Sequence, residues 1–123
     1  MTASSLIATG QRVLDVEMQA IQNLRPLIDA QFAAACQLML DSTGRIVVTG
    51  MGKSGHIGNK IAATLASTGT PAMFVHPAEA SHGDLGMVTA SDVVLAISNS
   101  GESEELTVLL PLIKRMGVPL LAM

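Results

Sequence analysis

The chain of 123 residues has no Trp and no Tyr, and its aromatic residues are Phe32 and Phe74. Proteins that bind single-stranded nucleic acids or uncharged sugar rings stack these ligands on aromatic side chains. The chain lacks such stacking platforms, so we expect any sugar that it binds to be held through a charged group.

Cysteine and basic residues are also scarce. Cys36 is the lone cysteine, so no disulfide can form within the chain, and no secretory signal opens it. We therefore expect a cytoplasmic protein. Seven Lys and Arg residues stand against ten Asp and Glu, which gives a formal net charge of -3. Because the basic residues are scattered, with Lys114 and Arg115 as the one adjacent pair, no basic stripe exists for a nucleic-acid partner.

Long apolar runs are missing, although 49% of the residues are hydrophobic. The longest nearly uninterrupted run, residues 106–113, contains Thr107 and Pro111. It is far shorter than the roughly 18 residues that cross a membrane. We expect no membrane partner, and one domain of residues 1–123 with an aliphatic core.

The periodicity of the apolar residues changes after a turn cluster at residues 41–44. Before it, helical spacing over residues 1–41 predicts two helices hinged near Pro26. After it, residues 45–123 alternate between apolar runs of strand length and helical stretches. The expected strands are 45–49, 72–75, 92–97 and 118–123, the expected helices are 54–67 and 103–116, and a loop or short helix is expected over 77–90.

This alternation predicts the α/β class. Strands that are apolar throughout are buried on both faces, so we expect a three-layer sandwich around a parallel sheet, preceded by a helical segment. The final run, residues 118–123, barely reaches the carboxyl end of a strand. We expect the fold to continue beyond Met123.

Two loops follow apolar strands and precede helices. The first reads Gly-Met-Gly-Lys-Ser-Gly over residues 50–55, and the second reads Ser-Asn-Ser-Gly-Glu-Ser over residues 98–103. Both would present backbone N–H groups and helix N-termini at one edge of the sheet, where anions bind. Ser98, Ser100 and Ser103 could converge on phosphate oxygens, although one of them is expected to cap the following helix.

The first loop has features of two nucleotide-binding motifs, the dinucleotide fingerprint and the Walker A loop. The glycines at 50, 52 and 55 fit the dinucleotide fingerprint, and a dinucleotide-dependent reductase would follow from it. That fingerprint needs an acid at the end of the next strand, where this chain has Val75 and His76. A Walker A loop would need glycine in place of Val47, so the P-loop interpretation fails.

These loops resemble the sugar isomerase (SIS) domain. The resemblance rests on Val-Thr-Gly-Met-Gly-Lys-Ser-Gly-His (48–56) and Ile-Ser-Asn-Ser-Gly-Glu-Ser (97–103), and the segment 76–86 narrows it to the arabinose-5-phosphate isomerases. It extends over essentially the whole chain. The resemblance implies an isomerase that interconverts D-ribulose 5-phosphate and D-arabinose 5-phosphate through an enediol, at the start of the pathway to the eight-carbon acid sugar (KDO) of lipopolysaccharide.

The resemblance also implies roles for individual residues. Glu105 would be the proton-transfer base, His82 would bind a substrate hydroxyl, and Lys53 would give electrostatic support. The substrate and its phosphate would be bound by Ser54, Gly69, Thr70, His82, Ser98, Asn99, Ser100 and Ser103. No cofactor is required, but His76 corresponds to a position where zinc is a candidate.

The sequence leaves other interpretations open. Acids such as Glu102, Glu104 and Glu105 are common in a first helical turn because the helix dipole favours them, and His56 is expected to be structural. The chain could also be a phosphosugar-binding regulatory module without catalysis.

A later histidine of the family and its paired CBS domains lie outside these residues, so we expect weak or absent activity from the chain alone. The aliphatic helical start and the resemblance favour a homo-oligomer, a tetramer in the family.

Overall fold

A computed structural model describes residues 2–123 and divides the chain into two units, one ending at Cys36 and one from Gln37 to Met123. The first unit is helical. Helix α1 (Ala3–Leu24) begins at Thr2, whose hydroxyl accepts a hydrogen bond from the Ser5 N–H at 3.2 Å. A 3₁₀ turn, η1 (Arg25–Leu27), follows, and α2 (Ala30–Leu40) runs into the second unit. The predicted hinge near Pro26 is confirmed.

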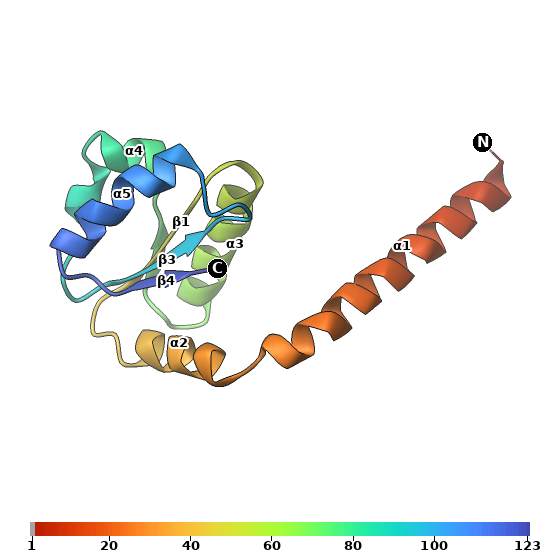
Figure 1. Cartoon of the computed structure of the whole chain (residues 1–123), viewed down its shortest axis with the longest axis horizontal. Coiled ribbons are helices and arrows are strands. Elements are labelled where there is room, and N and C mark those ends of the chain that lie inside the picture. Colours follow the sequence, from red (N-terminus) through yellow and green to blue (C-terminus); the bar gives the residue numbers. More distant parts are fainter. Residues whose placement is uncertain (1) are drawn as a thin grey trace. The chain divides into compact units, whose positions relative to one another are not determined.

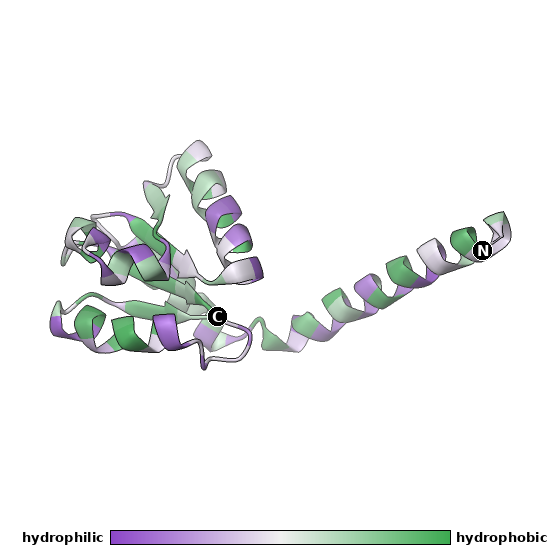
Figure 2. Ribbon diagram, turned by 90° about the horizontal axis from the view of Figure 1, so that it is seen from above, coloured by the Kyte–Doolittle hydropathy of each residue, from purple (hydrophilic) through white to green (hydrophobic). Residues whose placement is uncertain are grey.

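Helix α1 is amphipathic, and it buries none of its side chains within the chain. Figure 2 shows hydrophobic residues recurring along one side of this helix. Leu14 and Ile21 are 64% and 67% exposed. An amphipathic helix gains most of its stability from burying its apolar face. We therefore expect this exposed apolar stripe to pack against a partner.

The second unit is built on a parallel sheet of four strands (Figure 1). The strands are β1 (Ile46–Gly50), β2 (Ala72–Phe74), β3 (Val93–Ile97) and β4 (Leu120–Ala122), in the order β2-β1-β3-β4. Their connections contain α3 (Gly52–Ser67), α4 (Pro77–Ser81), the 3₁₀ turn η2 (Asp84–Met87) and α5 (Glu104–Arg115). The expected α/β class and parallel sheet are confirmed.

The core lies on both faces of this sheet. Val47 and Val94 point to one face, where they pack with Leu109 and Ile113 of α5. Neighbouring residues along the strands point to the other face and pack against α3 and the end of α2; they include Ile46, Val48 and Ile97. The alternation follows from the period of two in a strand. Helices thus cover the sheet on both sides, which gives the expected three layers.

A buried carboxylate joins the amino ends of β1 and β3. Asp92 is 2% exposed and accepts hydrogen bonds from the backbone N–H groups of Arg45 and Thr89, both at 2.7 Å, and from the Thr89 hydroxyl at 3.1 Å. The Arg45 guanidinium lies 3.5 Å from the same carboxylate. Asp92 therefore fixes the amino ends of β1 and β3. The two predicted loops follow the carboxyl ends of the same strands.

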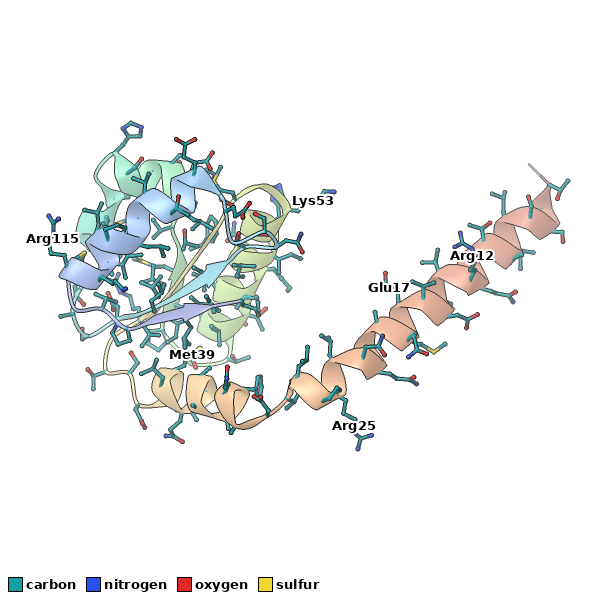
Figure 3. All side chains as sticks on the ribbon, viewed as in Figure 1. Arg12, Glu17, Arg25, Met39, Lys53 and Arg115 are labelled. Carbon is teal, nitrogen blue, oxygen red and sulfur yellow. The ribbon has the colours of Figure 1, made fainter. Side chains whose placement is uncertain are left out.

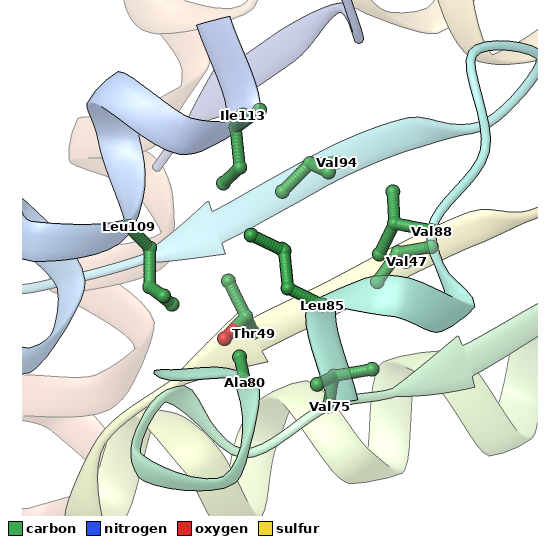
Figure 4. A pocket seen from close by; sticks show the side chains of 9 residues that line it. All are labelled: Val47, Thr49, Val75, Ala80, Leu85, Val88, Val94, Leu109 and Ile113. Atoms are coloured by element: carbon green, nitrogen blue, oxygen red, sulfur yellow. The ribbon is translucent and has the colours of Figure 1, made fainter. Parts of the chain in front are cut away.

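Thr49, in β1, is a buried hydroxyl without a hydrogen-bond partner among the described residues. It is 4% exposed and faces a small cavity whose other lining side chains are apolar (Figure 4). A buried hydroxyl that has lost its bonds to water without replacing them destabilises the folded state.

We expect Thr49→Val, which keeps the shape and removes the hydroxyl, to raise the free energy of unfolding by about 1–2 kcal/mol. Urea unfolding measures this change. Thr64→Val is the matched control, because the exposed Thr64 hydroxyl donates to the Lys60 carbonyl on its own helix. A destabilised Thr49→Val variant would mean that a water molecule satisfies the hydroxyl.

Candidate functional site

The two predicted loops lie side by side at the carboxyl edge of the sheet. Gly50 at the end of β1 pairs in register with Ile97 at the end of β3. From there β1 connects through α3 to β2, and β3 connects through α5 to β4 on the opposite side. This is the point where the strand order reverses, and ligands of open α/β sheets bind at such points. The predicted juxtaposition of the loops is confirmed.

The first loop turns sharply into α3. Gly52 has a φ of 54°, and a Cβ atom on Gly55 would come within 2.6 Å of the Gly50 carbonyl oxygen. Glycine at 55 is therefore required for the helix to begin so close to the strand. Ser54 is half-buried and Lys53 is exposed, with its side chain extending away from the ribbon in Figure 3.

The second loop is ordered by its own serines. The Ser98 hydroxyl accepts a hydrogen bond from the Gly101 N–H at 3.0 Å and lies 3.4 Å from the Ser103 hydroxyl. The Ser100 hydroxyl accepts from the Glu102 N–H at 3.2 Å. An accepting hydroxyl keeps its own hydrogen for donation. The loop is thus folded while Ser100 and one hydroxyl of the Ser98–Ser103 pair retain a hydrogen for an anion, and the other hydroxyl could turn to the anion when it binds. Asn99 beside them is exposed.

Neither helix at this edge has a side-chain cap. Met51 precedes α3 and Ser103 precedes α5, and neither side chain hydrogen-bonds to the helix that it precedes. The expectation that a serine caps α5 is therefore wrong, because Ser98 and Ser100 bond within the turn instead. Helices α1 and α4, in contrast, are capped by Thr2 and His76. Two uncapped N-termini with their partial positive charge meet at one edge, and this arrangement attracts an anion.

The three predicted catalytic residues come from three elements. Lys53 is in the first turn of α3 and Glu105 is in the first turn of α5, next to the second loop. His82 follows the last residue of α4, which packs against α5. All three side chains are exposed. The structure thus places Lys53 and Glu105 at the carboxyl edge, with His82 on the helical layer that contains Glu105.

Gly69 and Thr70 do not join the other predicted residues within one chain. They follow α3 and precede β2, at the amino edge of the sheet. The 16 residues of α3 separate the two edges, which corresponds to a helix about 24 Å long. If either residue contacts the ligand held by the loops, the contact comes from another copy of the chain.

His76, the candidate zinc ligand, caps α4. Its Nδ1 accepts a hydrogen bond from the Ala78 N–H at 3.3 Å. A neutral imidazole that accepts at Nδ1 carries its hydrogen on Nε2 and has no second lone pair to give to a metal. Among residues 2–123 no three His, Cys, Asp or Glu side chains cluster as a metal site would require. The residues of one chain therefore do not fit a zinc site.

The relationship to known proteins agrees with the geometry of this edge. Residues 39–123 match the SIS domain. The chain belongs to the SIS domain family. It is 60% identical over 117 residues to the arabinose 5-phosphate isomerase KdsD of Pseudomonas aeruginosa, a match that covers 95% of this chain and 36% of that protein. The KdsD protein of Escherichia coli K12 is 59% identical over 112 residues, covering 91% and 34%. The chain thus spans about a third of the length of these relatives.

Solved structures of the family share the fold. The E. coli CFT073 protein c3406, determined in complex with arabinose 5-phosphate, superposes with a TM-score of 0.90 at 44% sequence identity, over 99% of this chain and 65% of that one. A sugar-phosphate isomerase homologue from Listeria monocytogenes gives a TM-score of 0.93 at 28% identity, over 99% and 64%. The SIS-type sandwich expected from the two loops is confirmed.

The comparisons favour the SIS interpretation over the dinucleotide one. Strand β2 ends at Phe74 and is followed by Val75 and His76, so no acid lies at the position that would bind a ribose.

Within residues 2–123, no helix has both the length and the apolar character that crossing a membrane demands.

Proposed function

We propose that this chain forms the phosphosugar-binding part of an isomerase that interconverts D-ribulose 5-phosphate and D-arabinose 5-phosphate. The observation that carries the proposal is the meeting of two uncapped helix N-termini with a serine-lined loop at the switch point of the sheet. The names of the relatives and the arabinose 5-phosphate complex of a homologue support the choice of substrate.

The phosphate would lie at the carboxyl edge. The hydroxyls of Ser98, Ser100 and Ser103 would donate to its oxygens, as would Ser54 and the first N–H groups of α3 and α5. Asn99 would lie beside the bound ligand. Holding the phosphate leaves the carbon chain of the sugar to be positioned by the surrounding side chains.

The isomerisation would proceed through an enediol. A base removes the proton from C2 of the aldose and returns it to C1, while the hydrogen on the C2 hydroxyl moves to the C1 oxygen. Glu105 is our candidate for the base. By resemblance it occupies the position of the proton-transfer base in the family, and it lies next to the second loop. His82 would bind a substrate hydroxyl, and Lys53 would stabilise the negative charge that develops on oxygen. This chemistry requires no cofactor.

We further propose a cytoplasmic homo-oligomer, a tetramer as in the family. The exposed apolar stripe of α1 gives each copy a surface to bury. The location of Gly69 and Thr70 at the amino edge also agrees with a site that draws on more than one copy. Light scattering of the purified chain measures the assembly, and a monomer at micromolar concentration would contradict it.

Ligand-dependent thermal unfolding tests the function. D-arabinose 5-phosphate and D-ribulose 5-phosphate should raise the melting temperature of the chain, and NAD should not. Exchange of the C2 proton of D-arabinose 5-phosphate in D₂O, followed by NMR, then detects enediol formation. Stabilisation without exchange, both in this chain and in a longer protein that includes the family's later histidine, would favour a regulatory phosphosugar-binding module. Absence of stabilisation by either sugar phosphate would contradict both functions.

A further inference from the structure

A hollow lies beside the first loop, on the side of β2. It is bordered by the first two turns of α3, by the end of β2 and by His76, and its space, including the part that is open to solvent, is about 510 Å³. Its lining residues are Gly52, Gly55, His56, Asn59, Phe74 and His76. Because Gly52 and Gly55 belong to the first loop, the hollow opens directly next to the proposed phosphate site.

The lining combines polar groups with an apolar wall. His56 and Asn59 are three residues apart on α3 and so share one face of the helix. Both are exposed, and neither side chain hydrogen-bonds to another group among residues 2–123. His76 presents an Nε2–H donor, since its Nδ1 accepts from Ala78, and Phe74 adds an apolar surface. Donors and an amide oxygen around an apolar wall are suited to a sugar's hydroxyls and carbon chain.

The hollow is within reach of a ligand anchored at the second loop. Strands β2 and β3 flank β1 on either side, and neighbouring strands lie about 4.8 Å apart, so the ends of β2 and β3 are about 10 Å apart. The first loop lies between them. A phosphosugar bound at the serines and lying across this loop would extend its hydroxyls toward His56 and Asn59.

We infer that His56 and Asn59 form a subsite that binds hydroxyl groups of the phosphosugar. This inference rests on the proposed function, and it assigns a binding role to His56, which the sequence analysis expects to be structural. The subsite would distinguish a sugar phosphate from inorganic phosphate, because inorganic phosphate would bind between the two loops without reaching the hollow.

Calorimetric titration of the chain with D-arabinose 5-phosphate and with inorganic phosphate tests the inference. Asn59→Ala and His56→Ala should each weaken binding of the sugar phosphate by about tenfold, the effect of one lost hydrogen bond. Their affinity for inorganic phosphate should stay unchanged. Thr64→Ala is the control, an exposed polar side chain of the same helix outside the hollow.

The outcomes separate the two proposals. If the parent chain binds the sugar phosphate but both variants bind it equally well, the subsite is wrong and the proposed function stands. If the variants lose affinity for both ligands to the same extent, His56 and Asn59 act on the anion loop, and the subsite is again wrong. If the parent chain binds neither ligand, the proposed function fails together with the subsite.

Discussion

Glu105→Gln should slow the exchange of the C2 proton of D-arabinose 5-phosphate by about 10²- to 10⁴-fold, the contribution of a positioned general base. The amide has the size of the carboxylate but cannot take up a proton at neutral pH. Binding of the sugar phosphate should be retained, because the proposed phosphate contacts come from serine hydroxyls and backbone N–H groups. Proton exchange measures the step that needs the base, and it does not depend on complete turnover.

Glu104→Gln is the matched control for this prediction. Glu104 and Glu105 are adjacent and exposed in the first turn of α5, so both interact with the positive end of the helix dipole. A purely electrostatic role at the helix start would make the two variants alike. Equal exchange rates in both variants would therefore remove Glu105 from the reaction.

Asp92→Ala should lower the free energy of unfolding by about 2–4 kcal/mol. The substitution leaves the partly buried N–H groups of Arg45 and Thr89 without acceptors, and each unpaired buried donor costs up to about 1–3 kcal/mol. The Arg45 guanidinium adds little, because its side chain is 39% exposed. Urea unfolding at pH 7 measures the change. Asp15→Ala, an exposed acid on α1, should have no measurable effect, and an Asp92→Ala variant as stable as the parent would contradict the role of Asp92.

The same carboxylate predicts how stability depends on pH. Burial alone would raise the pKa of Asp92, but hydrogen bonds from Arg45 and Thr89 and the nearby guanidinium outweigh it and lower the pKa below its ordinary value of 3.8. The folded state thus binds this proton less readily than the unfolded state. The stabilisation is complete above the ordinary pKa and is lost as the pH falls through the lowered one. In the Asp92→Asn variant, the free energy of unfolding should fall less steeply as the pH drops below about 4.

Local pattern was sufficient to predict the sheet and its two loops. Apolar runs bounded by glycine and serine indicated β1 and β3, and the carboxyl ends of parallel strands meet at one edge. The positions of Lys53, Ser98 and Glu105 at that edge follow from the same reasoning. These are short-range features, in which each residue's location is decided by the strand directly before it.

The features that were missed depend on contacts between distant segments. Asp92 bonds to Arg45, 47 residues away, and nothing in the local sequence indicates this pairing. The hollow at His56 and Asn59 exists because β2 ends beside α3. The role of Gly69 and Thr70 in binding the substrate stays a prediction: α3 places both residues at the opposite edge of the sheet, so they would contact the ligand of another copy of the chain. The expected serine cap was wrong because the serines bond within their own turn.

Backbone amide NMR of the chain during titration with D-arabinose 5-phosphate tests the central claim most directly. Anion binding at two helix N-termini should shift the N–H resonances of residues 52–55 and 101–105 together, with one dissociation constant. Inorganic phosphate should shift the same resonances. Shifts confined to one loop, or found only elsewhere in the chain, would contradict a shared phosphate site at the carboxyl edge of the sheet.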